Sequence, residues 1–419
     1  QSLMDVFNLE TSLLPVLLDM REKGVKVNID GAEAAKKKLI SLKKDLIADI
    51  KHETGVSVEP WVAKSVASVF DHHNLYYDRT ENNGQPSFTK AFLQACSHPV
   101  AAKILRLREL DKASNTFIDN ILKFAHKGRI HCEFHQLRSD DGGTVTGRFS
   151  SSNPNLQQIP ARDPEIKAMI RGLFIPDDDC KWGSFDYSSQ EPRLLVHYCA
   201  SMGAKYRSPM IDSVVHEYHK GDADFHQMVA DMANISRKQA KTVNLGIMYG
   251  MGVGKLSHTM DISKDEAKAL LAQYHEKVPF VKGLADLVSA QASAHGKIRT
   301  MSGRLCRFDM WEPKTFGYSK PMKLEQAQKE YGPILRRAFT YKALNRLIQG
   351  SAADQTKVAM AECYKEGLVP LLTVHDELCF NVESEKQAAR ITEIMETSTP
   401  LKVPSKVDQE LGDNWGEVG

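Results

Sequence analysis

The sequence predicts an α+β fold, in which a core that contains strands is interrupted by a large helical insertion. Residues 181–186 have a strand pattern that runs into a helix at about 190–201, and residues 370–382 alternate like a β-hairpin. Between these segments, residues 206–334 are mainly helical. A chain of 419 residues exceeds the usual size of a single hydrophobic core, so two or three lobes are expected.

The first helix is predicted for residues 1–28, where Gly24 breaks the pattern. Its apolar stripe consists of Leu13, Leu14, Leu17 and Leu18. A long lysine-rich helix follows, and Asp30 is a candidate for its N-cap. The lysines indicate either a solvated helix face or an arm that touches phosphates, and charge alone leaves both open: Lys36, Lys37, Lys38, Lys43 and Lys44.

Four further regions complete the pattern. Residues 54–99 mix helix and loop, with a polar stretch at Glu81–Ser87, and residues 101–126 form a strong helix pattern. From residue 128 the pattern changes to short strands and loops. The last long helix is predicted for residues 343–367.

Composition places the chain among ordinary soluble proteins, with 42% hydrophobic and 26% charged residues. No apolar run is long enough to span a membrane and no signal peptide is recognisable, so no membrane partner is expected. Seven scattered cysteines without a CxxC pair favour a reducing compartment, the cytoplasm, and argue against a zinc cluster.

The net charge of +2 neither indicates nor excludes nucleic-acid binding, because a basic cleft and an acidic site cancel in the sum. The first residue is Gln1, so the chain is expected to be a fragment or a processed product.

Two distant aspartates form the first candidate site. Asp186 ends the strand in FDYSSQEPR, and Asp376 lies in LLTVHDELCF, where a hairpin turn would present His375, Asp376 and Glu377. Two carboxylates at strand ends can hold two magnesium ions about 3.5–4 Å apart, one activating an attacking oxygen and the other holding a leaving group. The competing interpretation is that each aspartate only caps backbone groups.

The segment SRKQAKTVNLGIMYGMG is the second candidate. Ser236 is a natural N-cap, and Arg237, Lys241, Leu245 and Tyr249 follow at intervals of four residues along one helix face. Two cations and an aromatic ring suit a nucleoside triphosphate. An amphipathic helix with a basic end is the alternative.

Two polar segments complete the set. TGRFSSSNPNLQQIPAR, with Arg148 and Arg162, suits a loop that holds a sugar–phosphate backbone. LNRLIQGSAADQTK places Asn345 and Gln349 four residues apart on an apolar helix, where amides can probe acceptors in the DNA minor groove. A structured surface loop and amides bonded to nearby backbone are the respective alternatives.

Together these segments resemble the family A DNA polymerases, the group of bacterial DNA polymerase I, in that family's order and spacing. DYSSQEPR is similar to motif A, RKQAKTVNLGIMYG to motif B and VHDE to motif C. TGRFSSSNPNLQQIP and LNRLIQGSAAD resemble two further signatures, and SLLPVLLDMREKGVKVN resembles the start of the polymerase region. The resemblance covers essentially the whole chain.

The resemblance implies template-directed extension of a primer with deoxynucleotides and release of pyrophosphate. Asp186 and Asp376 match the carboxylates that bind two Mg²⁺ ions, for which Mn²⁺ could substitute, and Glu377 matches their acidic neighbour. Glu191 matches the residue that excludes a ribose 2′-hydroxyl group. Ser188-x-x-Glu191 also has the pattern of a helix capping box, so Glu191 could serve both purposes.

Roles in substrate binding follow from the same resemblance. Arg237, Lys241 and His226 match ligands of the triphosphate, and Lys241 is also the candidate acid for the departing pyrophosphate. Tyr249 matches the aromatic residue at the base of the motif B helix. Residues that hold primer and template near their junction are matched by Arg148, Asn345, Gln349 and His375.

The implied architecture is a right hand with a palm built on an antiparallel sheet. The palm would comprise residues 1–29, 128–205 and 335–419. The helical thumb would comprise residues 30–127, and the helical fingers residues 206–334.

The chain departs from the family pattern at two places. Leu245 stands where Phe or Tyr is usual, so weak use of dideoxynucleotides is expected, and Ser189 and Gln190 replace the usual Gln-Ile of motif A. Nothing resembles a 3′–5′ exonuclease or a 5′ nuclease, so the chain as given should not proofread. A processivity factor and an upstream exonuclease region are left open.

Three alternatives compete with this function. A single-subunit RNA polymerase shares the aspartates, but Glu191 and TGRFSSSNPNLQQIP argue against it. A two-metal nuclease would not need the row of Arg237, Lys241 and Tyr249. A binding-only descendant would have no reason to keep clustered carboxylates beside a polyanion.

Overall fold

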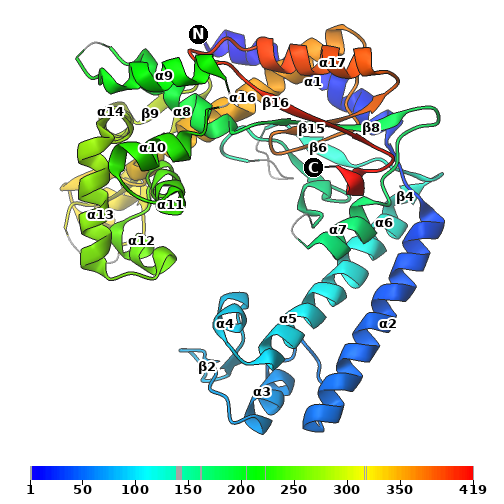
Figure 1. Ribbon diagram of the computed structural model, residues 1–419. Coiled ribbons are helices and arrows are strands. Elements are labelled where there is room, and N and C mark those ends of the chain that lie inside the picture. Colours follow the sequence, from blue (N-terminus) through cyan, green and yellow to red (C-terminus); the bar gives the residue numbers. More distant parts are fainter. Residues whose placement is uncertain are drawn as a thin grey trace.

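The computed structural model describes residues 2–137, 144–160, 163–203, 205–221, 223–315, 317 and 319–418. A small antiparallel sheet lies in the upper part of Figure 1, with one helical lobe to its left and another below it. The predicted α+β class is confirmed. Among the described residues, no helix is long and apolar enough to cross a membrane.

The central sheet has four antiparallel strands in the order β14-β15-β8-β16. The predicted strand is β8 (Lys181–Tyr187), and the predicted hairpin is β14 (Leu372–Val374) with β15 (Glu377–Val382). β16 (Val407–Gly412) pairs with the other edge of β8. In this register Asp186 lies opposite Glu377 on one side and Asp408 on the other.

The two faces of the sheet differ in chemistry. Phe185, Leu378 and Phe380 lie on the apolar face and pack in a core that includes residues of α1 (Leu3–Lys23), α16 (Ala343–Lys365) and α17 (Glu385–Thr397). These three helices cover that face in Figure 1. Because side chains alternate along a strand, the opposite face presents Ser184 and Asp186.

Helix α1 ends at Gly24, as predicted, but the predicted apolar stripe is partly wrong. Leu14 and Leu18 are 52% and 65% exposed, whereas Leu13 is fully buried. The buried positions recur at the period of one helix face: Val6, Leu13, Val16 and Met20.

One lobe is built on two long helices, α2 (Ile29–Thr54) and α5 (Pro99–Lys112). A π-helical segment, Ala113–Ile118, continues α5 into α6 (Asp119–Phe124). The tip of the lobe comprises α3 (Ala63–His72), β2 (Asp78–Arg79), β3 (Pro86–Ser87) and α4 (Lys90–Ala95).

The cap of α2 corrects a prediction. Asn28, not Asp30, is the N-cap, because its Oδ1 atom accepts a hydrogen bond of 2.9 Å from the backbone of Gly31. Asp30 lies inside the first turn, where its negative charge favours the helix dipole.

Short strands lie between this lobe and the central sheet. They are β1 (Val25–Lys26), β4 (Ala125–His126), β5 (Arg129–Ile130), β6 (Glu133–His135) and β7 (Ser150–Ser152). Those after residue 128 were expected, whereas β1 and β4 fall in stretches predicted as helix, at 1–28 and 101–126. The short helix α7 (Pro164–Arg171) precedes β8.

The second lobe follows β8 and is mainly helical, as predicted. Its helices are α8 (Gln190–Ser201), α9 (Met210–Lys220), α10 (Phe225–Ala233), α11 (Arg237–Met248), α12 (Val253–Met260), α13 (Lys264–Lys277) and α14 (Pro279–His295). The predicted pattern missed a set of short elements: β9 (Lys297–Arg299), β10 (Leu305–Arg307), β11 (Met310–Pro313), β12 (Met322–Lys323), α15 (Leu324–Tyr331) and β13 (Leu335–Arg337). Strands of two to four residues are too short to show alternation.

Candidate active site

The two predicted aspartates lie together at one end of the sheet. Asp186 is near the end of β8, and Asp376 lies in the turn between β14 and β15. The backbone N–H of Tyr187 donates a hydrogen bond of 3.3 Å to the carbonyl oxygen of Asp376. His375 takes a positive φ of 56° in this tight turn, and its side chain is exposed.

Negative charge is concentrated around Asp186. The pKa of Asp186 is raised to about 7, chiefly by loss of hydration within the site. The negative charges of its neighbours contribute the rest, in decreasing order Asp376, Glu377, Asp408 and Glu410. Burial also raises the pKa of Asp376, although Arg148 opposes this shift. Asp186 is nevertheless accessible to solvent. Repelling carboxylates at an accessible position favour a bound cation.

The donor set suits a hard divalent cation. Carboxylate oxygens are the ligands that Mg²⁺ prefers, and Mg²⁺ is commonly held by one or two carboxylates together with substrate phosphates. No group of three or more His, Cys, Asp and Glu side chains that could hold a metal occurs among the described residues. Asp186 and Asp376 therefore fit a site that substrate oxygens complete, rather than a preformed cage.

Glu377 is held more firmly than its neighbours. Its Oε1 atom accepts hydrogen bonds from Ser184 Oγ at 2.7 Å, Cys379 Sγ at 3.1 Å and Trp415 Nε1 at 3.3 Å. The side chain is buried. A carboxylate with so many donors supplies a fixed negative charge beside Asp186.

The sequence reasoning missed Asp408, which pairs with Asp186 across the other edge of β8. Glu410 follows two residues later and faces the same side of the sheet. The alternation in VDQE at 407–410, with acids at every second position, was the signal for this strand.

Glu191 lies in the first turn of α8 between two partners. Arg148 Nη2 is 2.6 Å from its Oε1 atom, and the hydroxyl group of Tyr249 donates to its Oε2 atom at 3.3 Å. The predicted capping role of Glu191 is wrong. The N-cap of α8 is Ser189, which has a left-handed φ of 51° and makes no side-chain capping bond.

Helix α11 confirms the predicted row of side chains. Ser236 caps it, and its hydroxyl accepts the backbone N–H of Gln239 at 3.2 Å. Arg237 and Lys241 are exposed and Leu245 is half-buried. Tyr249 follows directly after the helix.

Two residues that the sequence did not suggest, Asp224 and Asn244, contact Arg237 and His226, respectively. Asp224 caps α10 and pairs with Arg237 at 2.6 Å. The fully buried Asn244 lies 2.9 Å from His226 Nδ1 through its Nδ2 atom, and it accepts a hydrogen bond from the hydroxyl of Tyr274. Because the Asn244 amide donates to Nδ1, the Nε2–H group of His226 remains a donor. Burial lowers the pKa of His226, which favours this neutral form.

The remaining predicted residues lie around these groups. Asn345 and Gln349 are half-buried on α16, and an interaction with Gln349 lowers the pKa of the Tyr249 hydroxyl, which burial raises overall. Arg162 lies outside the described residues.

A pocket of about 230 Å³ joins the two halves of the site. Ser188 and Ser189 line it from the turn after β8, and His226 and Arg237 line it from the helical lobe. Lys406, just before β16, completes the cationic lining. Ser188 follows Asp186 by two residues, and Asp224, the partner of Arg237, also lines the pocket.

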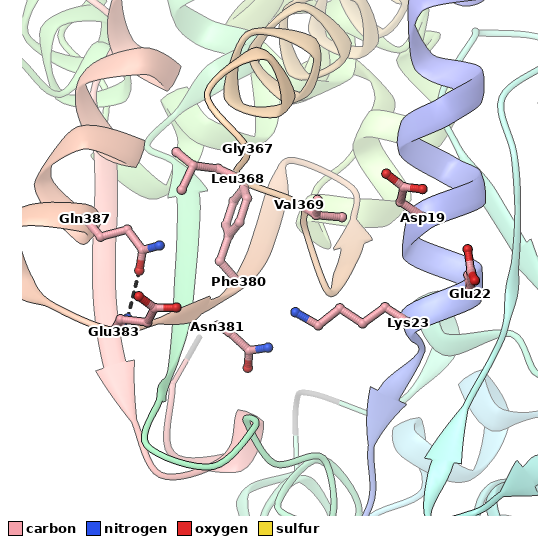
Figure 2. A pocket seen from close by; sticks show the side chains of 10 residues that line it. All are labelled: Asp19, Glu22, Lys23, Gly367, Leu368, Val369, Phe380, Asn381, Glu383 and Gln387. Carbon is pink, nitrogen blue, oxygen red and sulfur yellow. Dashed lines mark hydrogen bonds between the residues drawn. The ribbon is translucent and has the colours of Figure 1, made fainter.

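A larger pocket of about 450 Å³ lies elsewhere (Figure 2). It is formed by the end of α1, with Asp19 and Lys23, and by the far end of β15, with Phe380. Glu383 and Gln387 close one side through a hydrogen bond of 2.7 Å. Because Asp376 precedes the opposite end of β15, this pocket is separate from the carboxylates.

Comparisons with known proteins identify the family of this chain. A family model described as DNA polymerase family A matches residues 31–417. A DNA-directed DNA polymerase of Pseudomonas phage M6 is 35% identical over 99% of this chain and 66% of its own length. The thermostable DNA polymerase I of Thermus thermophilus is 32% identical over 80% of this chain and 39% of its own length. The chain thus spans about two thirds of the phage relative and much less of the bacterial one.

A solved structure extends the agreement to the fold. The POL domain of Pol1 from M. smegmatis, in complex with DNA primer-template and dNTP, matches with a TM-score of 0.77 and 26% identity. The match covers 97% of this chain and 70% of that chain. The predicted polymerase fold is confirmed, and the chain belongs to DNA polymerase family A.

Proposed function

We propose that this chain extends a DNA primer on a DNA template, adds deoxynucleotides to the 3′-hydroxyl group and releases pyrophosphate. The observation that carries the proposal is the pair of mutually repelling carboxylates, Asp186 and Asp376, at one end of the central sheet. Ser188 and Ser189, which follow Asp186 in the chain, line a pocket together with His226 and Arg237. Support comes from the relatives named as DNA polymerases and from the M. smegmatis structure, which holds primer-template and dNTP.

Asp186 and Asp376 would hold two Mg²⁺ ions, for which Mn²⁺ could substitute. When bound, such ions lower the pKa of an attacking hydroxyl group and neutralise charge on a leaving pyrophosphate. Glu377 and Asp408 add negative potential that favours the cations. Asp186, Glu377 and Asp408 come from three neighbouring strands and Asp376 from the turn before β15, so a rigid sheet sets the spacing of the first three.

The helical lobe would bind the triphosphate. Arg237 and Lys241 lie one turn apart and supply positive charge, and His226 donates from Nε2. Lys241 is our candidate for the acid that gives a proton to the departing pyrophosphate. Arg237 would leave its ion pair with Asp224 and bind the more highly charged triphosphate. Helix α11 would move inward as the site closes.

The sugar would be selected by Glu191. Its carboxylate is held by Arg148 and Tyr249, so it forms a fixed polar wall where a ribose 2′-hydroxyl would project. Leu245 is apolar and cannot hydrogen-bond to the nucleotide, which favours weak use of dideoxynucleotides.

The DNA would lie between the lobes. We assign residues 30–127 to a thumb and residues 206–334 to fingers, with the remainder as a palm. Primer and template would be held near their junction by Arg148, Arg162, Asn345, Gln349 and His375. The seven free thiols, five of them buried, support a location in a reducing compartment such as the cytoplasm.

Primer extension tests the proposal directly. A labelled primer on a DNA template with Mg²⁺ is offered dNTPs, rNTPs or ddNTPs in parallel reactions. We expect extension with dNTPs, little with rNTPs and weak termination with ddNTPs. Asp376→Asn should abolish extension but leave primer-template affinity within about threefold, because it removes a catalytic carboxylate without removing a DNA contact.

Other outcomes identify the alternatives. Preferred use of rNTPs would indicate an RNA polymerase, and a shortened primer would indicate a nuclease. Binding of primer-template without extension would overturn the polymerase proposal for this chain alone.

A further inference from the structure

A cluster of four buried charges lies where α1 and α16 meet the β9–β10 hairpin. It comprises Glu10 from α1, Arg304 from the β9–β10 hairpin, and Asp354 and Lys357 from α16. Arg304 Nη2 and Lys357 Nζ lie 2.5 Å and 2.7 Å from Glu10 Oε1, and Arg304 Nε donates to Asp354 Oδ1 at 2.9 Å. Each of the four residues is at most 7% exposed, and two positive charges balance two negative charges.

Stability alone does not explain such a cluster. Buried ion pairs lose hydration that their attraction only partly restores, and apolar residues of similar volume often serve stability equally well. Burial lowers the pKa of Lys357 to about 8, so the side chain is still mainly protonated at neutral pH. The cluster does fix the relative positions of the segments that meet in it.

The cluster supports both ends of the segment that carries Arg148. Lys357 Nζ donates to the carbonyl oxygen of Gln136 at 2.8 Å, and Gln136 Nε2 donates to Glu10 Oε2 at 2.9 Å. These bonds hold the chain before residue 138.

At the other end of the segment, Gly147 and Phe149 contact Arg304 and Lys357 of the same cluster. Gly147, at φ +82°, lies so close to Arg304 that an added Cβ would be 2.7 Å from the Arg304 Nε atom. Lys357 Nζ is 5.0 Å from the centre of the Phe149 ring. Arg148 is therefore flanked on both sides by residues that contact the cluster, and its own side chain reaches Glu191.

We infer that Glu10, Arg304, Asp354 and Lys357 act as positioning residues, which fix the backbone on either side of Arg148 and thereby hold Glu191 in place for sugar selection. The inference rests on the proposed polymerase function. Its consequence is that a change in the cluster, remote from the nucleotide, alters the choice between dNTP and rNTP as well as stability.

The test compares Lys357→Met with a control that removes another ion pair. Arg129→Met breaks a pair of 2.6 Å between β5 and Asp177, which precedes β8. For each variant, the midpoint of thermal unfolding and the ratio of kcat/KM for dNTP over rNTP are measured. Arg304→Lys keeps the positive charge but loses the planar guanidinium group that can bond to Glu10 and Asp354 together. It replaces Lys357→Met in the test if that variant does not fold.

We expect the dNTP/rNTP ratio of Lys357→Met to fall about tenfold, since a misplacement of 1 Å can cost up to about a hundredfold. The control should lower only the unfolding midpoint. In an Arg148→Ala background Lys357→Met should cause no further loss of selectivity, because both changes act through one contact. An unchanged ratio with a lowered midpoint would overturn the inference. Failure of the wild-type chain to extend a primer would instead reject the proposed function.

Discussion

At the residue scale, the carboxyl group of Asp186 couples folding, pH and cation binding. Its pKa is raised from 3.8 to about 7, first by loss of hydration and then by Asp376. Between these two values the folded chain binds more protons than the unfolded chain. The free energy of unfolding of the metal-free protein therefore falls as the pH rises through this window. A cation that replaces the proton would restore that stability.

We accordingly predict that the unfolding midpoint of the metal-free protein decreases between pH 5 and pH 8, and that Mg²⁺ raises the midpoint more at pH 8 than at pH 5. Asp186→Asn should remove most of both effects. Calorimetry at four pH values, with and without Mg²⁺, measures them. Asp265→Asn, at a side chain that is 96% exposed, is the matched control. A Mg²⁺ effect of equal size in Asp186→Asn would exclude Asp186 as a ligand.

Residues with recognisable neighbours in the sequence could be predicted, and residues that act through distant partners could not. Asp376 was predicted because its hairpin is local, and the row from Arg237 to Tyr249 because it repeats every four residues. Asn244 acts on His226, which is 18 residues away on another helix, so no local pattern reveals it. The capping role of Glu191 was wrong because the contact with Arg148 is made instead.

At the element scale, α10, α11 and α13 are joined by hydrogen bonds through the buried side chain of Asn244. Asn244 projects from the buried face of α11 toward His226 on α10, and it accepts from Tyr274 on α13. The exposed face of α11 carries Arg237 and Lys241. One helix thus carries exposed positive charge on one face and orients a histidine with the other.

Replacing Asn244 with Leu should weaken nucleotide use by about tenfold in kcat/KM, the value of one charge-assisted hydrogen bond. The loss should disappear in a His226→Ala background, since the amide acts through the histidine. Single-nucleotide incorporation rates measure both. Gln273→Leu removes a bond of 2.6 Å between α13 and Ala233 without touching His226, and it should leave kcat/KM unchanged. Additive losses in the double variant would show that Asn244 does not act through His226.

At the scale of the whole molecule, the sheet with two flanking lobes was predictable because its parts are long and periodic. β8 with α8, the hairpin at 370–382 and the helices of the second lobe all appear where their patterns place them. The strands between residues 297 and 337 were missed because none exceeds four residues. The extent of thumb, palm and fingers rests on the family resemblance and stays a prediction.

The two explanations of the lysine-rich helix α2 can now be separated. Lys36 pairs with Asp119 at 2.5 Å and Lys43 pairs with Asp111, so these two lysines connect helices within the lobe. Lys37, Lys38 and Lys44 are exposed. If this lobe lies along the DNA, only the exposed set should contact phosphates.

We therefore predict different effects for the two sets. Changing Lys37, Lys38 and Lys44 to Gln should reduce the slope of log affinity against log salt by about 0.9 for each phosphate that the chain no longer neutralises, measured by anisotropy of labelled primer-template. Changing Lys36 and Lys43 to Gln should leave the slope unchanged and lower the unfolding midpoint instead, because those side chains hold the lobe together. A slope unaffected by the first set would mean that α2 presents a solvated face, and the DNA-binding surface of this lobe would then have to lie on other helices.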